Sequence, residues 1–312
     1  MKHKQNQQQF LRSGFAKSVL IGSLISMSFM GCASGVRQLA ATPHSDWGQE
    51  SEPDSLWIKA DSLWAFRENA KQANEALITY ASAIEQQPLP VLMTQYARAC
   101  FYMGMYIDSD PVKADMHFRN GAASAREALN DHPGYAQVMA ETKDENEAVE
   151  MVSGPFLESV FWSAANTGRA LMTRDPYVRK AAESRFKAMV KQLLENDEHL
   201  FYSGPHRLAA MVSLRTPGGN TQDNFQEAKK HFQLGLKQNP NFVGSYTLYA
   251  EYYAAPAGDK ALFVKLLEAA QQVSDDALPE VAAENRFEKK RALALLQKME
   301  TFFPMKSTAV NE

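Results

Sequence analysis

Apolar residues recur at helical spacing along almost the whole chain from Leu56 onward. Residues four apart lie on one face of a helix, where they pack against a neighbouring helix. The chain shows no sustained two-residue alternation and few β-hairpin turn signals, so the pattern predicts an all-α body. Its main feature is a four-residue stripe that occurs three times in full: Ala76, Tyr80, Ile84 and Pro88; Gly121, Ala125, Leu129 and Pro133; Ala228, Phe232, Leu236 and Pro240.

Each full stripe ends in a proline, which cannot continue a helix and enforces a turn to the next one. Phe186, Val190 and Leu194 begin a fourth stripe, in which Glu198 replaces the proline. The stripes resemble the second helix of a tetratricopeptide repeat, although their separations of 45, 65 and 42 residues differ from the steady 34 of that repeat. We therefore expect an all-α, divergent tetratricopeptide-like array of antiparallel helix pairs, with generic antiparallel packing as the alternative.

Capping residues predict individual helix boundaries. Asp223 is placed to cap a helix that runs to about Gln238, and Asp259 to cap one from Lys260 to Val273. Residues 280–303 are expected to form one last amphipathic helix that closes the array. The helical domain is expected to span residues 56–303, followed by a disordered tail at 304–312.

The first 31 residues have the pattern of a signal peptide. A basic leader precedes about thirteen uncharged residues, which are too few to span a bilayer but fit a signal-peptide core. The segment ends at Gly31-Cys32 and small residues follow, which looks like a bacterial lipobox. We expect Cys32 to carry a lipid anchor, and the absence of an acid after it favours the outer membrane. The alternatives are a non-lipidated signal peptide and a short core helix.

Composition, charge and cysteine content indicate a tether, the class of partner and the state of the second thiol. Residues 32–55 contain prolines, glycines and scattered charges and read as a flexible tether. Without residues 1–31 the chain carries 29 basic and 36 acidic residues, a net charge of −7, which argues against nucleic-acid binding. Lipidation of Cys32 would leave Cys100 unpaired within an apolar run, where we expect a buried, inert thiol.

Several segments of the second half carry a family resemblance. They are residues 161–169 (FWSAANTGR), 202–207 (YSGPHR), 228–232 (AKKHF), 249–253 (YAEYY) and 285–292 (NRFEKKRA). With these segments the chain resembles the T-component lipoproteins of TRAP transporters over roughly residues 56–303. The resemblance implies an α-helical body with cryptic repeats that forms a homotrimer. It also implies an internal apolar channel and docking of a periplasmic solute-binding protein.

We find no convincing catalytic or metal-binding pattern in the sequence. There is no HExxH run, no G-x-S-x-G elbow and no P-loop or dinucleotide fingerprint. The acidic run Glu195 to His199 reads as a solvated face. We therefore expect no enzyme activity, cofactor or metal.

The polar pair His206-Arg207 follows Gly204-Pro205 and is expected to lie at the start of a helix. It could contact an acidic ligand group or a partner protein, because a helix amino end and an Arg fork both favour anions. The structural alternative, which we favour, is that the pair ties the preceding turn to a carboxylate of a neighbouring helix.

Trp162 and Asn166 stand four apart, so they share a helix face. Trp162 could line an apolar channel or fill the core, and the tyrosine stripe at 246, 249, 252 and 253 has the same two interpretations, with the core favoured in both. Asn166, if buried, should hydrogen-bond a loop or face a wet cavity. The candidate ligand- or partner-binding residues are Trp162, Asn166, Arg169, Tyr202, His206 and Arg207.

Two functions remain open at this stage. The first is a membrane-tethered, non-enzymatic scaffold that binds a periplasmic solute-binding protein and a small hydrophobic or carboxylate ligand. The second is a structural tetratricopeptide lipoprotein in envelope assembly, with protein partners only.

Overall fold

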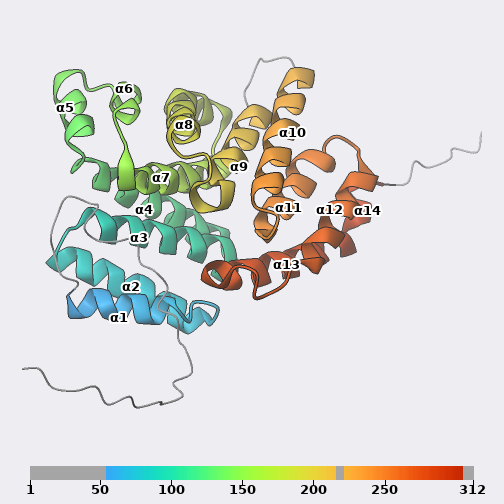
Figure 1. Ribbon diagram of the computed structural model, residues 1–312, viewed down its shortest axis with the longest axis horizontal. Coiled ribbons are helices and arrows are strands. Elements are labelled where there is room, and N and C mark those ends of the chain that lie inside the picture. The colour runs from blue at the N-terminus through green and yellow to red at the C-terminus, as the bar shows by residue number, and fades with distance from the viewer. Residues whose placement is uncertain (1–53, 216–220, 305–312) are drawn as a thin grey trace, which may run out of the picture. The chain divides into compact units, whose positions relative to one another are not determined.

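The computed structural model describes residues 54–215 and 221–304, which contain fourteen α-helices and no strand. The prediction of an all-α body is confirmed (Figure 1). The predicted signal peptide, Cys32, nearly all of the tether and residues 305–312 lie outside the described residues. None of the described helices combines the length and apolar character that crossing a membrane requires.

The helices follow one another with short connections. They are α1 Ser55–Trp64, α2 Ala70–Gln86, α3 Pro90–Tyr102, α4 Pro111–Leu129, α5 Pro133–Glu141, α6 Glu145–Glu150, α7 Leu157–Ala170, α8 Pro176–Asn196, α9 Leu200–Arg215, α10 Thr221–Gln238, α11 Val243–Tyr249, α12 Lys260–Gln272, α13 Ala282–Gln297 and α14 Met299–Phe302. Two π-helical turns, η2 Met103–Ile107 and η5 Ala250–Ala254, directly follow α3 and α11.

Side-chain caps and prolines set the helix starts. Asp259 accepts a hydrogen bond from the backbone N–H of Leu262, so α12 begins where its cap predicts and ends at Gln272, one residue early. Pro111, Pro133 and Pro176 each occupy the first position of a helix, where a missing N–H costs nothing. Helix α10 begins at Thr221, two residues before Asp223, and ends at Gln238 as predicted.

The predicted stripes face other helices. Ala76, Tyr80, Gly121, Ala125, Leu129, Ala228 and Phe232 are all buried. The three stripe prolines are exposed: Pro88 and Pro240 lie in connections between helices, and Pro133 begins α5. Helices that are adjacent in sequence pack on one another, as in α1 with α2, α3 with α4 and α9 with α10, and α4 also packs on α7. This arrangement fits the predicted array of helix pairs.

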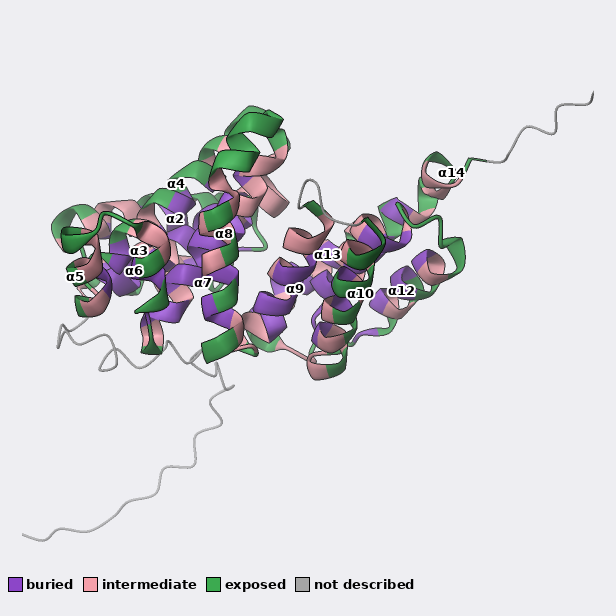
Figure 2. Cartoon of the chain, turned by 90° about the horizontal axis from the view of Figure 1, so that it is seen from above, coloured by how far each residue is buried: buried purple, intermediate pink, exposed green. Residues whose placement is uncertain are grey.

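Two clusters of buried apolar residues form the core (Figure 2). The first is built mainly from α1 to α8 and centres on large side chains such as Trp57, Tyr80 and Leu92. The second is built from α9 to α13 around Phe232, Phe263 and Leu267. Burial of this much apolar surface supplies the main stabilising free energy. Cys100, the cysteine of the described residues, is free.

The expectation of a single last helix over residues 280–303 is wrong. A 3₁₀ turn at Pro279–Val281 leads into α13, and a break at Lys298 separates α13 from α14. Helix α13 packs on α11 and α12. It also carries a row of buried polar side chains, Glu284, Asn285 and Glu288.

This polar row joins α13 to segments far away in the sequence. Both oxygens of Glu284 accept hydrogen bonds from the Arg67 guanidinium, Oε2 at 2.7 Å and Oε1 at 3.2 Å, and Arg98 Nη2 lies 3.7 Å from Oε1. Asn285 accepts from the backbone N–H of Val243 at 2.9 Å and donates to Asn241. Polar contacts therefore tie α13 to Arg67 near the start of the described chain and to Asn241 and Val243 at the start of α11.

Gly121 gives a direct test of the packing between α4 and α7. A Cβ at this position would come within 2.7 Å of the Asn166 amide, which is fully buried and donates to the carbonyls of Ala97 and Trp162. Because Asn166 cannot move without losing those bonds, we expect Gly121→Ala to lower the free energy of unfolding by about 1–3 kcal/mol.

The matched control is Gly235→Ala on α10, where a new Cβ would meet its nearest neighbour at 3.7 Å. Alanine favours a helix over glycine by up to about 1 kcal/mol, so this variant should be neutral or stabilised. Urea unfolding followed by circular dichroism compares the two. Equal stability of Gly121→Ala and wild type would contradict the close packing.

Candidate functional site: an aromatic cavity with an arginine rim

A cavity of about 100 Å³ lies among α3, η2, α7, α9, α11 and α13. Its wall is mainly apolar and aromatic, with four arginines and two glutamates. The aromatic lining residues are Phe101, Tyr102, Tyr106, Phe161, Trp162, Phe186, Phe201 and Phe242, and the charged ones are Arg98, Arg169, Arg207, Arg215, Glu284 and Glu288. A concave apolar site with few polar groups is the usual form of a small-molecule site.

Trp162 belongs to the buried core and also lines the cavity. Its side chain is buried, and its ring lies 4.8 Å from that of Phe201 and 4.9 Å from that of Phe161. Arg98 stacks its guanidinium over the Trp162 and Phe201 rings at 5.9 and 5.4 Å. The aromatic wall is thus fixed by edge-to-face packing and by a cation–π contact.

The first turn of α9 has an unusual backbone. Phe201, Tyr202 and Ser203 all have positive φ values of 44° to 60°, a left-handed conformation that costs about 1–2 kcal/mol per residue. Arg207 holds this turn, since its guanidinium donates to the carbonyls of Tyr202 and Phe201, the latter at 2.7 Å. This left-handed turn places the Phe201 ring at the wall of the cavity.

Within the segment Gly-Pro-His-Arg, Gly204 and Arg207 both pack against aromatic rings of the cavity wall. A Cβ at Gly204 would approach the Phe161 ring to 2.3 Å, so only glycine fits there. Arg207 also lies 4.2 Å from the centre of the Phe242 ring. Burial lowers the pKa of Arg207 to about 9. Arg207 therefore has a structural role, as the favoured alternative predicted, but it binds backbone carbonyls and not a carboxylate. It also lines the cavity.

His206, its neighbour, points away from the cavity. Its Nδ1 lies 2.9 Å from Nδ1 of His231 on α10, so one ring donates and the other accepts, and its Nε2 lies 3.2 Å from Glu198. His231 in turn contacts Glu227 at 3.1 Å. Of the two predicted roles for the pair, His206 follows the structural one, as a tie between α9, α10 and the Glu198 carboxylate.

Asn166 and Tyr202 do not line the cavity either. Asn166 bonds two helix carbonyls, those of Ala97 and Trp162, so the expectation of a loop contact or a wet cavity is corrected: it pins α7 to α3. Tyr202 stacks on Phe242 and its hydroxyl donates to Glu280 at 3.2 Å, beside a separate hollow.

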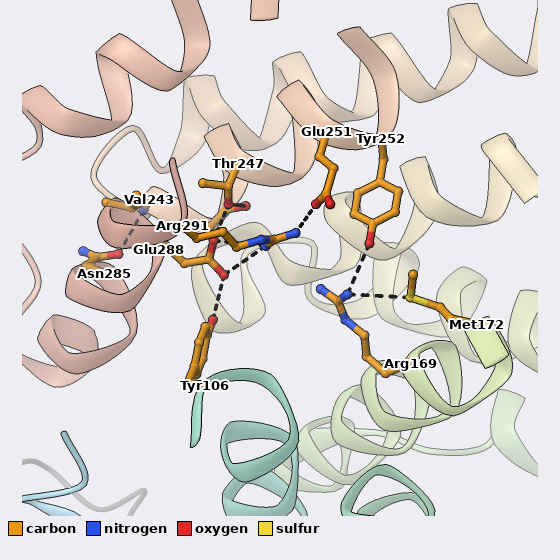
Figure 3. A network of polar contacts seen from close by, with 11 residues as sticks. Tyr106, Arg169, Met172, Val243, Thr247, Glu251, Tyr252, Asn285, Glu288 and Arg291 are labelled. Atoms are coloured by element: carbon orange, nitrogen blue, oxygen red, sulfur yellow. Dashed lines mark hydrogen bonds and ion pairs between the residues drawn. The ribbon is translucent and has the colours of Figure 1, made fainter. Parts of the chain in front are cut away.

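Arg169, one of the predicted site residues, lines the cavity. Only Nη1 of its guanidinium makes contacts with the described residues. Its Nη1 contacts the Tyr252 hydroxyl at 3.4 Å and Met172 Sδ at 3.6 Å (Figure 3). Tyr252 comes from η5, and Met105 and Tyr106 of η2 line the cavity on another side. Both π-helical turns therefore contribute to the site, as these rare turns often do.

The sequence analysis did not identify Glu284, Glu288 and Arg215 as site residues, although all three line the cavity. Glu288 accepts hydrogen bonds from Tyr106, Thr247 and Arg291, and Arg291 also pairs with Glu251 (Figure 3). The available signal was two acids four apart, Glu284 and Glu288, in an otherwise basic and apolar helix. Such spacing is normally that of a solvated face, so it gives little warning of burial.

The described residues hold no cluster of His, Cys, Asp and Glu that could bind a metal ion. Cys100 is fully buried, and burial raises the pKa of its thiol to about 12, which agrees with the expected inert thiol.

The histidine pair predicts how stability depends on pH. Burial lowers the pKa of both His206 and His231 below the ordinary 6.5, so the unfolded chain binds protons that the folded chain excludes. Stability should therefore fall as pH drops below about 6.5, by up to about 1.4 kcal/mol per pH unit for each excluded proton. Replacing both with glutamine should reduce this loss, measured by urea unfolding at pH 7.5 and 5.5. An unchanged pH dependence in the double variant would contradict the assignment.

Comparison with known proteins gives one clear relationship. A search of curated proteins returns no match to the chain. The model of the TRAP transporter T-component family, in contrast, matches residues 70–303, which include the cavity, the left-handed turn and α13. Because this match covers most of the chain, the protein belongs to the TRAP transporter T-component family.

Proposed function

We propose that this protein is a non-enzymatic T-component that docks a periplasmic solute-binding protein and takes up a small, largely apolar ligand from it. The observation that carries the proposal is the aromatic cavity in the middle of the helical body. A protein that served only as a structural assembly factor would not need a cavity lined by eight aromatic side chains. Buried volume left unfilled costs stability, so it is retained where it serves binding.

A second hollow supports an entry route. A space of about 290 Å³ adjoins the cavity and shares Gly168, Met172, Phe186, Met211 and Arg215 with it. Its outer wall is formed by the start of α8, including Pro176 and Arg179. A ligand released at this end would meet Leu171, Met172 and Met211 on the way to the aromatic wall, with charged side chains beside them.

An exposed apolar surface lies at the same end. Val112 and Met116 on α4 are 67% and 49% exposed, and Tyr177 and Val178 on α8 are 83% and 40% exposed. The ion pair of Asp115 with Arg174, at 2.7 Å, brings the two helix starts together. We call these four residues the α4–α8 patch. Exposed apolar groups gathered at one place are typical of a protein contact.

The anchor completes the proposal. A lipid on Cys32 would hold the protein at a membrane of the envelope, the outer membrane by its sequence pattern, with residues 33–55 as a tether. A homotrimer is supported by the family resemblance. The solute-binding protein is the occupant that we assign to the α4–α8 patch, because the patch lies beside the hollow through which a ligand would pass.

Acidic substitutions in the patch test the docking. Val112 and Tyr177 each lie in the first turn of a helix, where a glutamate is favoured by the helix dipole, so Val112→Glu/Tyr177→Glu should fold normally. Cross-linking in whole cells, affinity isolation of the full-length protein and mass spectrometry measure the recovered solute-binding protein. We expect recovery to fall at least tenfold.

The control is Ile58→Glu, an equally apolar and exposed position on α1. It should recover as much solute-binding protein as wild type. Equal recovery by all three proteins would contradict the assignment of the patch. Recovery of envelope-assembly proteins with no solute-binding protein would favour the structural lipoprotein instead.

A further inference from the structure

Helix α1 and the turn that follows it carry large apolar residues on two opposite sides. Trp57, Ala60 and Trp64 are buried, and α1 packs mainly on α2. With 3.6 residues per turn, the other side of α1 is formed by residues that are all exposed. With the two residues after the helix they are Ser55, Ile58, Lys59, Ser62, Ala65 and Phe66, which we call the α1 face.

Two large side chains dominate the α1 face. Ile58 is 56% exposed and Phe66 is 68% exposed. Phe66 lies in a hydrogen-bonded turn, since its N–H donates to the carbonyl of Leu63 and its carbonyl accepts from the N–H of Asn69, both at 3.0 Å. The backbone of this turn is thereby fixed, and the Phe66 ring is held outward.

Such a surface is unusual at the first helix pair of a stacked array. The outer face of a terminal pair is normally polar, because solubility requires it. A helix with apolar residues on both sides is normally covered on both sides. Within the described part of the chain, α2 covers one side of α1 and no helix covers the α1 face. We therefore looked for an occupant outside the helical body.

The charge of the α1 face favours a bilayer over an ordinary protein contact. Its one charged residue is Lys59, although the chain without residues 1–31 has a net charge of −7. The nearest acids along the chain are engaged: Asp61 accepts from the Tyr80 hydroxyl at 2.6 Å, and Glu68 pairs with Arg286 at 2.6 Å. An anionic bilayer repels acids and attracts lysine, so it matches this surface.

The length of chain before α1 places the face close to the expected anchor. Asp54 caps α1, and Cys32 precedes Asp54 by 22 positions. A flexible chain of 22 residues spans about 25 Å on average and at most about 80 Å. A ten-residue helix adds only about 15 Å. Tethering at this range gives a millimolar effective concentration, so even a weak apolar contact with the bilayer would be populated.

We propose that the α1 face lies on the bilayer that holds the anchor, with Ile58 and Phe66 inserted at the boundary of headgroups and acyl chains and Lys59 among the headgroups. This inference rests on the proposed function, which supplies the anchor. It goes further because it gives the helical body a fixed side toward the membrane.

Fluorescence quenching in vesicles tests the proposal with the full-length, acylated protein. Phe66→Cys is labelled with a thiol-reactive fluorophore, and the native thiols do not compete, because Cys100 is fully buried and Cys32 is acylated. The vesicles are made of phosphatidylethanolamine and phosphatidylglycerol, with or without bromine on the acyl chains. Bromine quenches only a fluorophore that reaches the chains. We expect brominated vesicles to lower the emission from position 66 at least twofold.

The matched control is Met151→Cys at the end of α6, where the native side chain is 51% exposed. Its emission should be the same in both kinds of vesicle. Adding Ile58→Glu to labelled Phe66→Cys should at least halve the quenching, because a carboxylate resists entry into an anionic bilayer. The same Ile58→Glu should leave recovery of the solute-binding protein unchanged.

Equal quenching at positions 66 and 151, or undiminished quenching with Ile58→Glu, would overturn the inference. So would an unquenched fluorophore on protein that floats with the vesicles. Disulfide-linked pairs of unlabelled Phe66→Cys, together with an unquenched label, would assign the α1 face to a second copy of the chain instead. Protein that does not float with the vesicles lacks the anchor, and this result alone would overturn the proposed anchoring together with the inference.

Discussion

The buried carboxylate of Glu288 is the interaction on which the rest of the structure depends. It lies on α13, is 2% exposed, and receives hydrogen bonds from η2, α11 and its own helix neighbour Arg291. Burying a carboxylate costs several kcal/mol, and only a complete set of partners offsets this. Glu288 therefore requires Tyr106, 182 residues away, to be in place. Together with Glu284, which Arg67 binds, it connects the cavity wall on α13 to segments far away in the sequence.

The local features of the fold could be predicted from the sequence because they depend on neighbouring residues. Helical periodicity, prolines and capping side chains predicted an all-α body, the buried stripes, the end of α10 and the bounds of α12 to within one residue. Helix α10 begins three residues before the start that a cap at Asp223 predicts. The break at Lys298 and the left-handed turn at Phe201 to Ser203 were not predictable in this way. The turn persists because Arg207 and the packing of Gly204 on Phe161 impose it, and these are contacts of the folded chain.

The sequence predicted only part of the candidate site, because contacts between distant segments decide which side chains reach the cavity. The segment 202–207 was singled out as one element, but the structure divides it: Arg207 reaches the cavity, His206 ties two helices, and Tyr202 borders another hollow. Arg169 was found through its motif. Arg215 was missed because an arginine in the last turn of a helix is ordinary, and only the fold brings it to Arg169 across Tyr252.

As a member of the T-component family, the protein acts at the cell envelope with other components of a TRAP transporter. We propose that this role depends on a cavity whose wall is held in place by the polar row of α13. Hydrogen–deuterium exchange of wild type and Glu288→Gln tests that link most directly. We predict faster exchange in the variant at both η2 and α11, the segments from which Tyr106 and Thr247 donate hydrogen bonds to Glu288. Faster exchange confined to α13 itself would contradict the account.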